Sequence, residues 1–241
     1  MLRKDQRKDL VIKLTTIFKD LELGEFEEIN DVVTEARKQA TIDIVMKRNG
    51  GLVNLFDDQI ETLKSRGCPQ AILEVFQNKK SKVIVKAVKM EIPEGNIPFV
   101  PVIPRTYMGI YGLMPMVRNG NNVGYTHLDP NDIIDNEEVP KGLYYVYDVE
   151  PGKATLGKSS KEAEKIIKKQ NRLCHILDED IATCVHTDVL SDHYLMSTGS
   201  CDRNGNEVPH ICISDDEPVL SWYCDGDLHG RWGSASCRSR A

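Results

Sequence analysis

Apolar side chains recur at the three-and-four spacing of a helix face through the first 80 residues. We expect four helices there. The first carries Leu10, Leu14, Ile17, Phe18 and Leu21. The second spans about 25–47 and ends at Asn49–Gly51, because glycine readily adopts the left-handed conformation of a helix cap. The third spans 52–65 and the fourth 69–78, with Pro69 suited to a first turn.

After Ser81 the pattern changes from helical spacing to short apolar runs. The β-branched run 82–89 and the aromatic run 143–149 predict strands. Between them, residues 93–115 contain five prolines among apolar side chains, which predicts an extended segment or a sheet edge, since proline cannot donate to a ladder. Residues 119–122 predict a turn.

The rest of the chain alternates helix and strand signals. Residues 159–170 predict a helix capped by Ser159 or Ser160, and 178–186 a shorter one. Residues 195–213 predict a hairpin turning at Asn204–Gly205, because Asn-Gly suits a type I′ turn. The fold class is therefore α+β, with a helical N-terminal part and then a mixed, loop-rich β-sheet domain. We divide the chain into an extension, 1–51, and a domain, 52–241.

Composition narrows the class of protein. The formal net charge of −6 comes with no basic block, which argues against a nucleic-acid-binding protein. No run of about 18 apolar residues predicts a membrane span, and the charged N-terminus lacks the apolar region of a signal peptide. Seven cysteines, an odd number, then predict reduced thiols in a cytoplasmic protein.

Five segments carry a family resemblance: 55–63, 102–104, 147–152, 171–173 and, most specifically, the Trp-Gly-Ser-Ala-Ser-Cys ending within 231–237. Over about residues 52–238 the chain resembles a bacterial family of uncharacterised proteins, a domain of unknown function. The resemblance implies a soluble bacterial protein, and it implies no activity, cofactor or catalytic residue. Whether the protein is an enzyme stays open.

The last twenty residues hold both tryptophans, two cysteines, a histidine and three arginines before Ala241, whereas chain ends usually become small and polar. We therefore expect this segment to fold back against a site for a small molecule or a protein. The candidate binding residues are Arg231, Trp232, Ser234, Ser236, Arg172 and His186.

A thiol-dependent hydrolase or transferase is the first enzyme alternative. Cys237 would be the nucleophile and His229, eight residues earlier, its base, with Asp225 or Asp227 orienting the imidazole. The competing interpretation makes Trp232 a core plug, Gly233 a point of close backbone passage and Cys237 a buried, inert thiol.

Nucleotide binding is the second enzyme alternative. Residues 152–159 match the phosphate-loop pattern, with Gly152, Gly157, Lys158 and Ser159 at its fixed positions. The preceding strand is too polar for a central parallel strand, and few residues remain for further βαβ units. A proline–glycine turn before a serine-capped helix explains the same letters.

Metal and partner signals are weaker. The cysteines and histidines of the C-terminal half lack the paired spacing of a zinc site, and the Asp-Gly turns lack the offsets of a calcium loop, so we expect no metal site. The sequence leaves the cofactor unknown. The N-terminal helices either cover the apolar segment 97–104 of their own chain or form a homo-oligomer.

Overall fold

The computed structural model describes residues 23–224 and 230–241. The chain divides into two compact units, Met1–Arg48 and Asn49–Ala241. The described part of the first unit is one helix, α2 (Leu23–Arg48). The predicted helix containing Leu10–Leu21 lies outside the described residues. The predicted break falls at Asn49 itself, and Gly50 and Gly51 begin the next helix instead of capping α2.

Three helices open the second unit: α3 (Gly50–Ser65), α4 (Gln70–Gln77) and α5 (Lys80–Val88). The last of these corrects our prediction of a strand over 82–89. Val83, Ile84 and Ala87 are the buried residues of α5, and their spacing is that of one helix face. Burying this face outweighs the strand preference of its β-branched residues.

The first sheet is antiparallel and has three strands, in the order β1 (Ile97–Val102), β6 (Tyr144–Val149), β14 (Ser239–Arg240). The proline-containing strand β1 is at the edge, as predicted. Its alternating side chains separate two faces. Phe99 and Tyr145 meet Phe56 of α3, with Tyr145 also edge-on to Phe76 of α4 at 5.3 Å between ring centroids.

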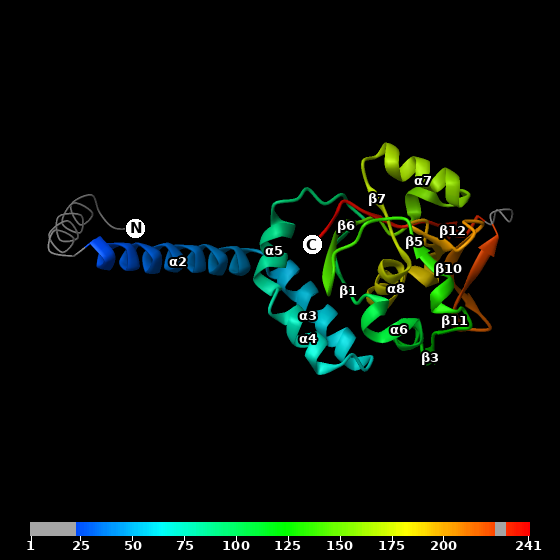
Figure 1. The fold of residues 1–241 in the computed structure, drawn as a ribbon, viewed down its shortest axis with the longest axis horizontal. Helices are drawn as coiled ribbons and strands as arrows, with labels where there is room; N and C mark the ends of the chain where they lie inside the picture. The colour runs from blue at the N-terminus through cyan, green and yellow to red at the C-terminus, as the bar shows by residue number, and fades with distance from the viewer. Residues whose placement is uncertain (1–22, 225–229) are drawn as a thin grey trace. The chain divides into compact units, whose positions relative to one another are not determined.

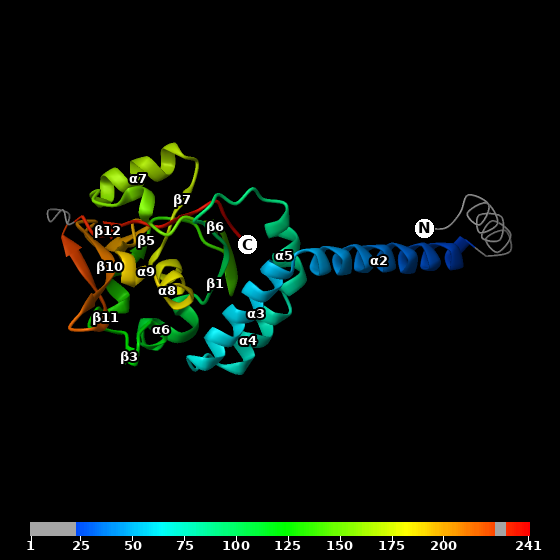
Figure 2. The ribbon, with the colours of Figure 1, turned by 180° about the vertical axis from the view of Figure 1, so that it is seen from behind.

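The opposite face of this sheet packs against α8 (Leu177–His186), the most buried helix of the unit. Val100, Val102, Tyr144 and Val146 form one apolar cluster with Ala182 of α8 and with Cys237. In Figures 1 and 2, α8 lies inside the unit, between β1 and the second sheet. Two apolar layers of the core therefore lie on either side of this short sheet, and a further cluster contains Met196 and Trp232.

The second sheet has the order β12 (Trp232–Gly233), β8 (Tyr194–Met196), β10 (Glu207–Ser214), β11 (Glu217–Cys224), β4 (Tyr125–Thr126). β8 and β10 pair antiparallel, as predicted. The type I′ turn was misplaced, however. Only Gly205 has a positive φ in the predicted turn, whereas Asp215 and Asp216 both have one and join β10 to β11.

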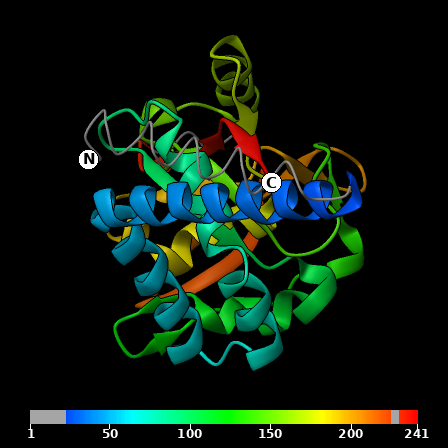
Figure 3. The ribbon, with the colours of Figure 1, turned by 90° about the vertical axis from the view of Figure 1, so that its left-hand side faces the viewer.

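Shorter elements connect these layers. Ser159 caps α7 (Ser160–Lys169) through a reciprocal pair of bonds with Glu162, and α7 projects from one side of the unit in Figures 1 and 3. The predicted turn at 119–122 joins β2 and β3. The other elements are α6 (Arg105–Leu113), η1 (Met114–Met116), β2 (Arg118–Asn119), β3 (Asn122–Val123), η2 (Pro130–Asp132), β5 (Ile133–Asp135), η3 (Lys153–Thr155), β7 (Leu173–Cys174), α9 (Val189–Asp192), β9 (Ser200–Asp202) and β13 (Ser236–Cys237).

The architecture is α+β, as predicted, with helices concentrated before the strand-rich region. Among the described residues, no helix combines the length and apolar character needed to cross a membrane.

Candidate functional site

The C-terminal segment, here residues 230–241, is part of the core, as the sequence pattern predicted. Trp232 is 8% exposed and packs edge-on to Tyr194 and His210, at 5.1 and 4.6 Å between ring centroids. Arg231 is exposed, with its guanidinium 4.7 Å from the centroid of the Tyr194 ring. Both residues therefore contribute to packing in this conformation.

The phosphate-loop match is explained by packing against the same segment. Gly152 has a φ of 102°, and a Cβ at Gly233 would lie 2.2 Å from the carbonyl oxygen of Gly152. The two glycines thus allow two backbones to touch. The amides of Gly152 and Ala154 donate to the Glu150 carboxylate, and the Gly157 amide donates to the Trp232 carbonyl. A phosphate cradle needs such amides to be free.

The two serines and Arg172 form a second set of structural contacts. The Ser234 amide donates to Thr155 Oγ1 over 2.7 Å, and Arg172 Nε donates to Ser236 Oγ over 2.9 Å. Arg172 also pairs with the fully buried Asp148 at 3.0 Å, and Arg238 reaches the same carboxylate at 2.8 Å. These bonds tie the segment to β6 itself, to the turn after β6 and to the residue before β7.

Cys237 does have a histidine neighbour, but it is His175. The Cys237 Sγ, a ring nitrogen of His175 and a carboxylate oxygen of Glu179 all lie within 4.8 Å of one another, and all three residues are fully buried. His175 Nδ1 bonds Asp180 Oδ1 over 3.0 Å. His229, Asp225 and Asp227, the predicted partners, lie outside the described residues. We call Cys237, His175, Glu179 and Asp180 the buried thiol centre.

Charge in the buried thiol centre is compensated by hydrogen bonds. Burial alone would lower the pKa of His175, but its bonds to Asp180 and Cys237 and the charge of Glu179 raise that pKa to about 10. Arg240 donates to both oxygens of Glu179, over 2.6 and 2.9 Å, and Tyr144 donates to one of them. Because Arg240 occupies the Glu179 carboxylate, we assign no metal ion to this centre.

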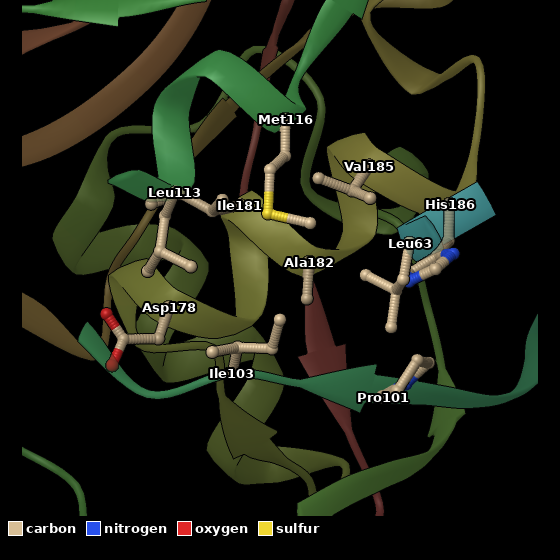
Figure 4. Close-up of a pocket in the computed structure, with 10 residues that line it drawn as sticks. All are labelled: Leu63, Pro101, Ile103, Leu113, Met116, Asp178, Ile181, Ala182, Val185 and His186. Carbon is tan, nitrogen blue, oxygen red and sulfur yellow. The ribbon is translucent and has the colours of Figure 1, made fainter. Parts of the chain in front are cut away.

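His186 faces a narrow apolar cleft between α8 and the segments around Leu63, Ile103 and Met116, drawn in Figure 4. The cleft has a volume of about 10 Å³, which is barely enough for a single water molecule. Asp178 lines the cleft as well, and Figure 4 shows its carboxylate well away from His186. Arg105 holds that carboxylate through its amide and its guanidinium, at 2.9 and 3.1 Å. The cleft is too small for a metabolite.

A larger hollow, of about 150 Å³, opens where the end of α3, the β2–β3 hairpin and the turn between α8 and α9 meet. We call it the arginine hollow, and its lining includes Arg66, Arg118, Asn119, Thr187, Asp188 and Ser191. Our sequence reasoning placed no site here. Arg66 follows a predicted helix and Arg118 precedes a predicted turn, and such positions give no sign that two residues 52 apart meet.

The described residues thus define an α+β domain that is closed by its own C-terminal segment and carries a charged surface hollow. The chain belongs to DUF5701, a family of unknown function, whose model matches residues 59–241. This agrees with the resemblance to a domain of unknown function, while a bacterial source stays a prediction. No curated protein and no solved structure matches the chain.

Proposed function

We propose that this protein binds a small molecule through an oxyanion group, such as the phosphate of a metabolite, in the arginine hollow. The observation that carries the proposal is the pair of guanidinium groups, from Arg66 and Arg118, lining one small polar hollow. Guanidinium groups bind phosphate and carboxylate oxygens through charge-assisted, often bidentate hydrogen bonds.

These two arginines differ from the other arginines that bond to the core. Arg105, Arg172 and Arg240 each bond a buried carboxylate. Among the described residues, the side chain of Arg66 donates only to the Met116 carbonyl, over 2.6 Å. The side chain of Arg118, on the β2–β3 hairpin, forms no ion pair with them. The hollow therefore contains positive charge that the described residues leave incompletely compensated.

The electrostatics of Arg66 support the same conclusion. Burial and the charge of Arg118 both lower the pKa of Arg66, and only Asp188 acts in the opposite direction. A bound anion would relieve the repulsion between the two guanidinium groups. One carboxylate against two guanidinium groups leaves a net positive charge in the hollow.

The hollow is also held in shape. Asn119 and Asn122 both donate to the Asp216 carbonyl, over 2.9 and 3.0 Å, which fixes the hairpin that carries Arg118. Thr187 Oγ1 donates to the Thr183 carbonyl over 2.7 Å and accepts from the Val189 amide. A site that is formed before binding loses less conformational entropy on binding.

The other surface hollows offer less for an anion. The hollow of about 270 Å³ beside Pro151 contains Lys153 and Asp192, which pair at 3.1 Å. The hollow of about 220 Å³ beside α7 is lined by Lys161 and Glu164, with one charge of each sign. The volume of the arginine hollow is roughly half the lower limit of drug-sized pockets, which suits a phosphate group.

Isothermal titration of the full chain with inorganic phosphate tests the proposal. We expect one site, weakened by added salt, and a 10- to 100-fold weaker affinity in Arg118→Gln, since a hydrogen bond to a charged group contributes about 1.5–3 kcal/mol. Arg37→Gln, which makes the same charge change on exposed α2, is the matched control. No binding at millimolar phosphate, or equal affinity in the wild type and Arg118→Gln, would overturn the proposal.

A further inference from the structure

The buried thiol centre lies apart from the arginine hollow and carries chemistry of its own. Cys237 comes from strand β13. His175 lies in the loop before α8, and Glu179 and Asp180 lie in the first turn of that helix. His175 Nδ1 is bonded to Asp180, so Nε2 is the nitrogen left for the Cys237 thiol. Nε2 has no nitrogen or oxygen partner among the described residues. A thiol, an imidazole and an orienting carboxylate are the parts of a nucleophilic site.

We propose that Cys237 is a nucleophilic thiol activated by His175, positioned by Asp180 and sheltered by strand β14. The proposal is independent of oxyanion binding. The chemistry that fits is acyl transfer from an ester. His175 holds the proton of the Cys237 thiol before the attack. Sγ then bonds to the carbonyl carbon as the ester C–O bond breaks, and the imidazolium of His175 gives that proton to the departing alkoxide. The products are a thioester on Cys237 and an alcohol, with no oxidant or reductant needed.

The structure shows what keeps the site closed. Cys237 is fully buried, and the residues that follow it form β14, a two-residue edge strand beside β6. Arg240 fastens this strand through Glu179 and through the Cys174 carbonyl, at 2.7 Å from the latter. A short edge strand opens at a lower free-energy cost than the core does. Substrate access therefore requires β14 to leave β6, with Arg240 as the latch.

The energetic cost of burying several ionisable side chains supports a functional role for the buried thiol centre. A buried group of ionisable side chains is often no more stable than an apolar core of the same volume. Burial alone would lower the pKa of Arg240, and the hydrogen bonds and charge of Glu179 raise it, so the latch stays charged. Arg240, the latch, is paired with Glu179, and the imidazole of His175 is paired with Asp180.

Site-resolved labelling with iodoacetamide tests the proposal. In the native chain we expect Cys237 to react more slowly than the half-buried Cys201. Arg240→Gln should speed labelling of Cys237 at least 10-fold and leave the buried Cys184 unchanged. Adding His175→Asn to that variant should return the rate to that of the same thiol in the urea-unfolded chain. p-Nitrophenyl acetate should acetylate Cys237 in Arg240→Gln and leave it unmodified in the double variant.

A measurement on the wild type covers the case in which Arg240→Gln does not fold. With urea raised below the unfolding transition, Cys237 should become reactive before Cys184, because β14 opens locally. Two results would overturn the proposal. One is simultaneous labelling of Cys237 and Cys184. The other is an opened Cys237 that reacts no faster than in the unfolded chain.

Discussion

At the scale of single residues, His186 differs from the other described histidines because both of its ring nitrogens are buried without a hydrogen-bond partner in the described chain. Burial, assisted by the charge of Arg66, lowers the pKa of His186 to about 3. A neutral imidazole is therefore built into the apolar cleft of Figure 4. In the unfolded chain the same group takes up a proton near its ordinary pKa of 6.5.

This difference predicts how stability depends on pH. Between pH 6.5 and about 3 the unfolded chain binds the proton and the folded chain does not, so the contribution of His186 is present above pH 6.5 and is lost as the pH falls. His186→Phe should flatten the fall in unfolding free energy between pH 6.5 and 4, by up to about 1.4 kcal/mol per pH unit. Urea denaturation at several pH values measures it. The exposed His127→Phe is the control, and equal slopes in the wild type and His186→Phe would contradict the assignment.

Gly233 gives a second prediction at this scale. A Cβ there would lie 2.2 Å from the Gly152 carbonyl oxygen, whereas a Cβ at Gly230 would meet nothing within 4 Å. We expect Gly233→Ala to lower the unfolding free energy by about 3 kcal/mol or more, because two backbones would have to separate. Gly230→Ala should change it by less than about 0.5 kcal/mol. Similar thermal midpoints for the two variants would show that the backbones do not touch.

At the scale of elements, much of the fold followed from the sequence. The helical spacing located α3, α4, α7 and α8, and the proline density placed β1 at an edge. Helix α5 did not follow, because its β-branched residues suit a strand and its buried face forms only against the sheet. The type I′ turn was also missed at Asp215–Asp216, since aspartate at both central positions is a weaker signal than Asn-Gly.

The cap of α7 can be tested directly. Ser159 accepts from the Glu162 amide, so Ser159→Ala should cost about 1 kcal/mol of unfolding free energy. Lys165→Ala, on the exposed face of the same helix, keeps the cap and should have almost no effect. Chemical denaturation of the two variants measures the difference. A loss in nucleotide affinity from Ser159→Ala without a loss in stability would instead favour the phosphate-loop interpretation.

The candidate sites were less predictable than the elements. Cys237 was singled out, but its histidine neighbour is 62 residues away along the chain and meets it only through the β7–β13 pairing. Arg66 and Arg118 line the same hollow because the end of α3, the β2–β3 hairpin and the turn between α8 and α9 come together there. Such convergence depends on tertiary packing and leaves no spacing pattern in the chain.

At the scale of the whole second unit, the C-terminal segment pairs with strands of three separate sheets. Its strands β12, β13 and β14 add to three different sheets, beside β8, β7 and β6. The last residue, Ala241, exchanges backbone hydrogen bonds with Tyr145. The segment therefore adds a strand to each of the two larger sheets, and the buried thiol centre takes Cys237 from it.

Truncation after Gly230 tests this central claim most directly. We predict that the shortened chain loses the single cooperative thermal transition of the full chain and exposes apolar surface to a hydrophobic dye, because three sheets lose a strand at once. A truncated chain that melts in one transition at the temperature of the full-length protein would contradict the account.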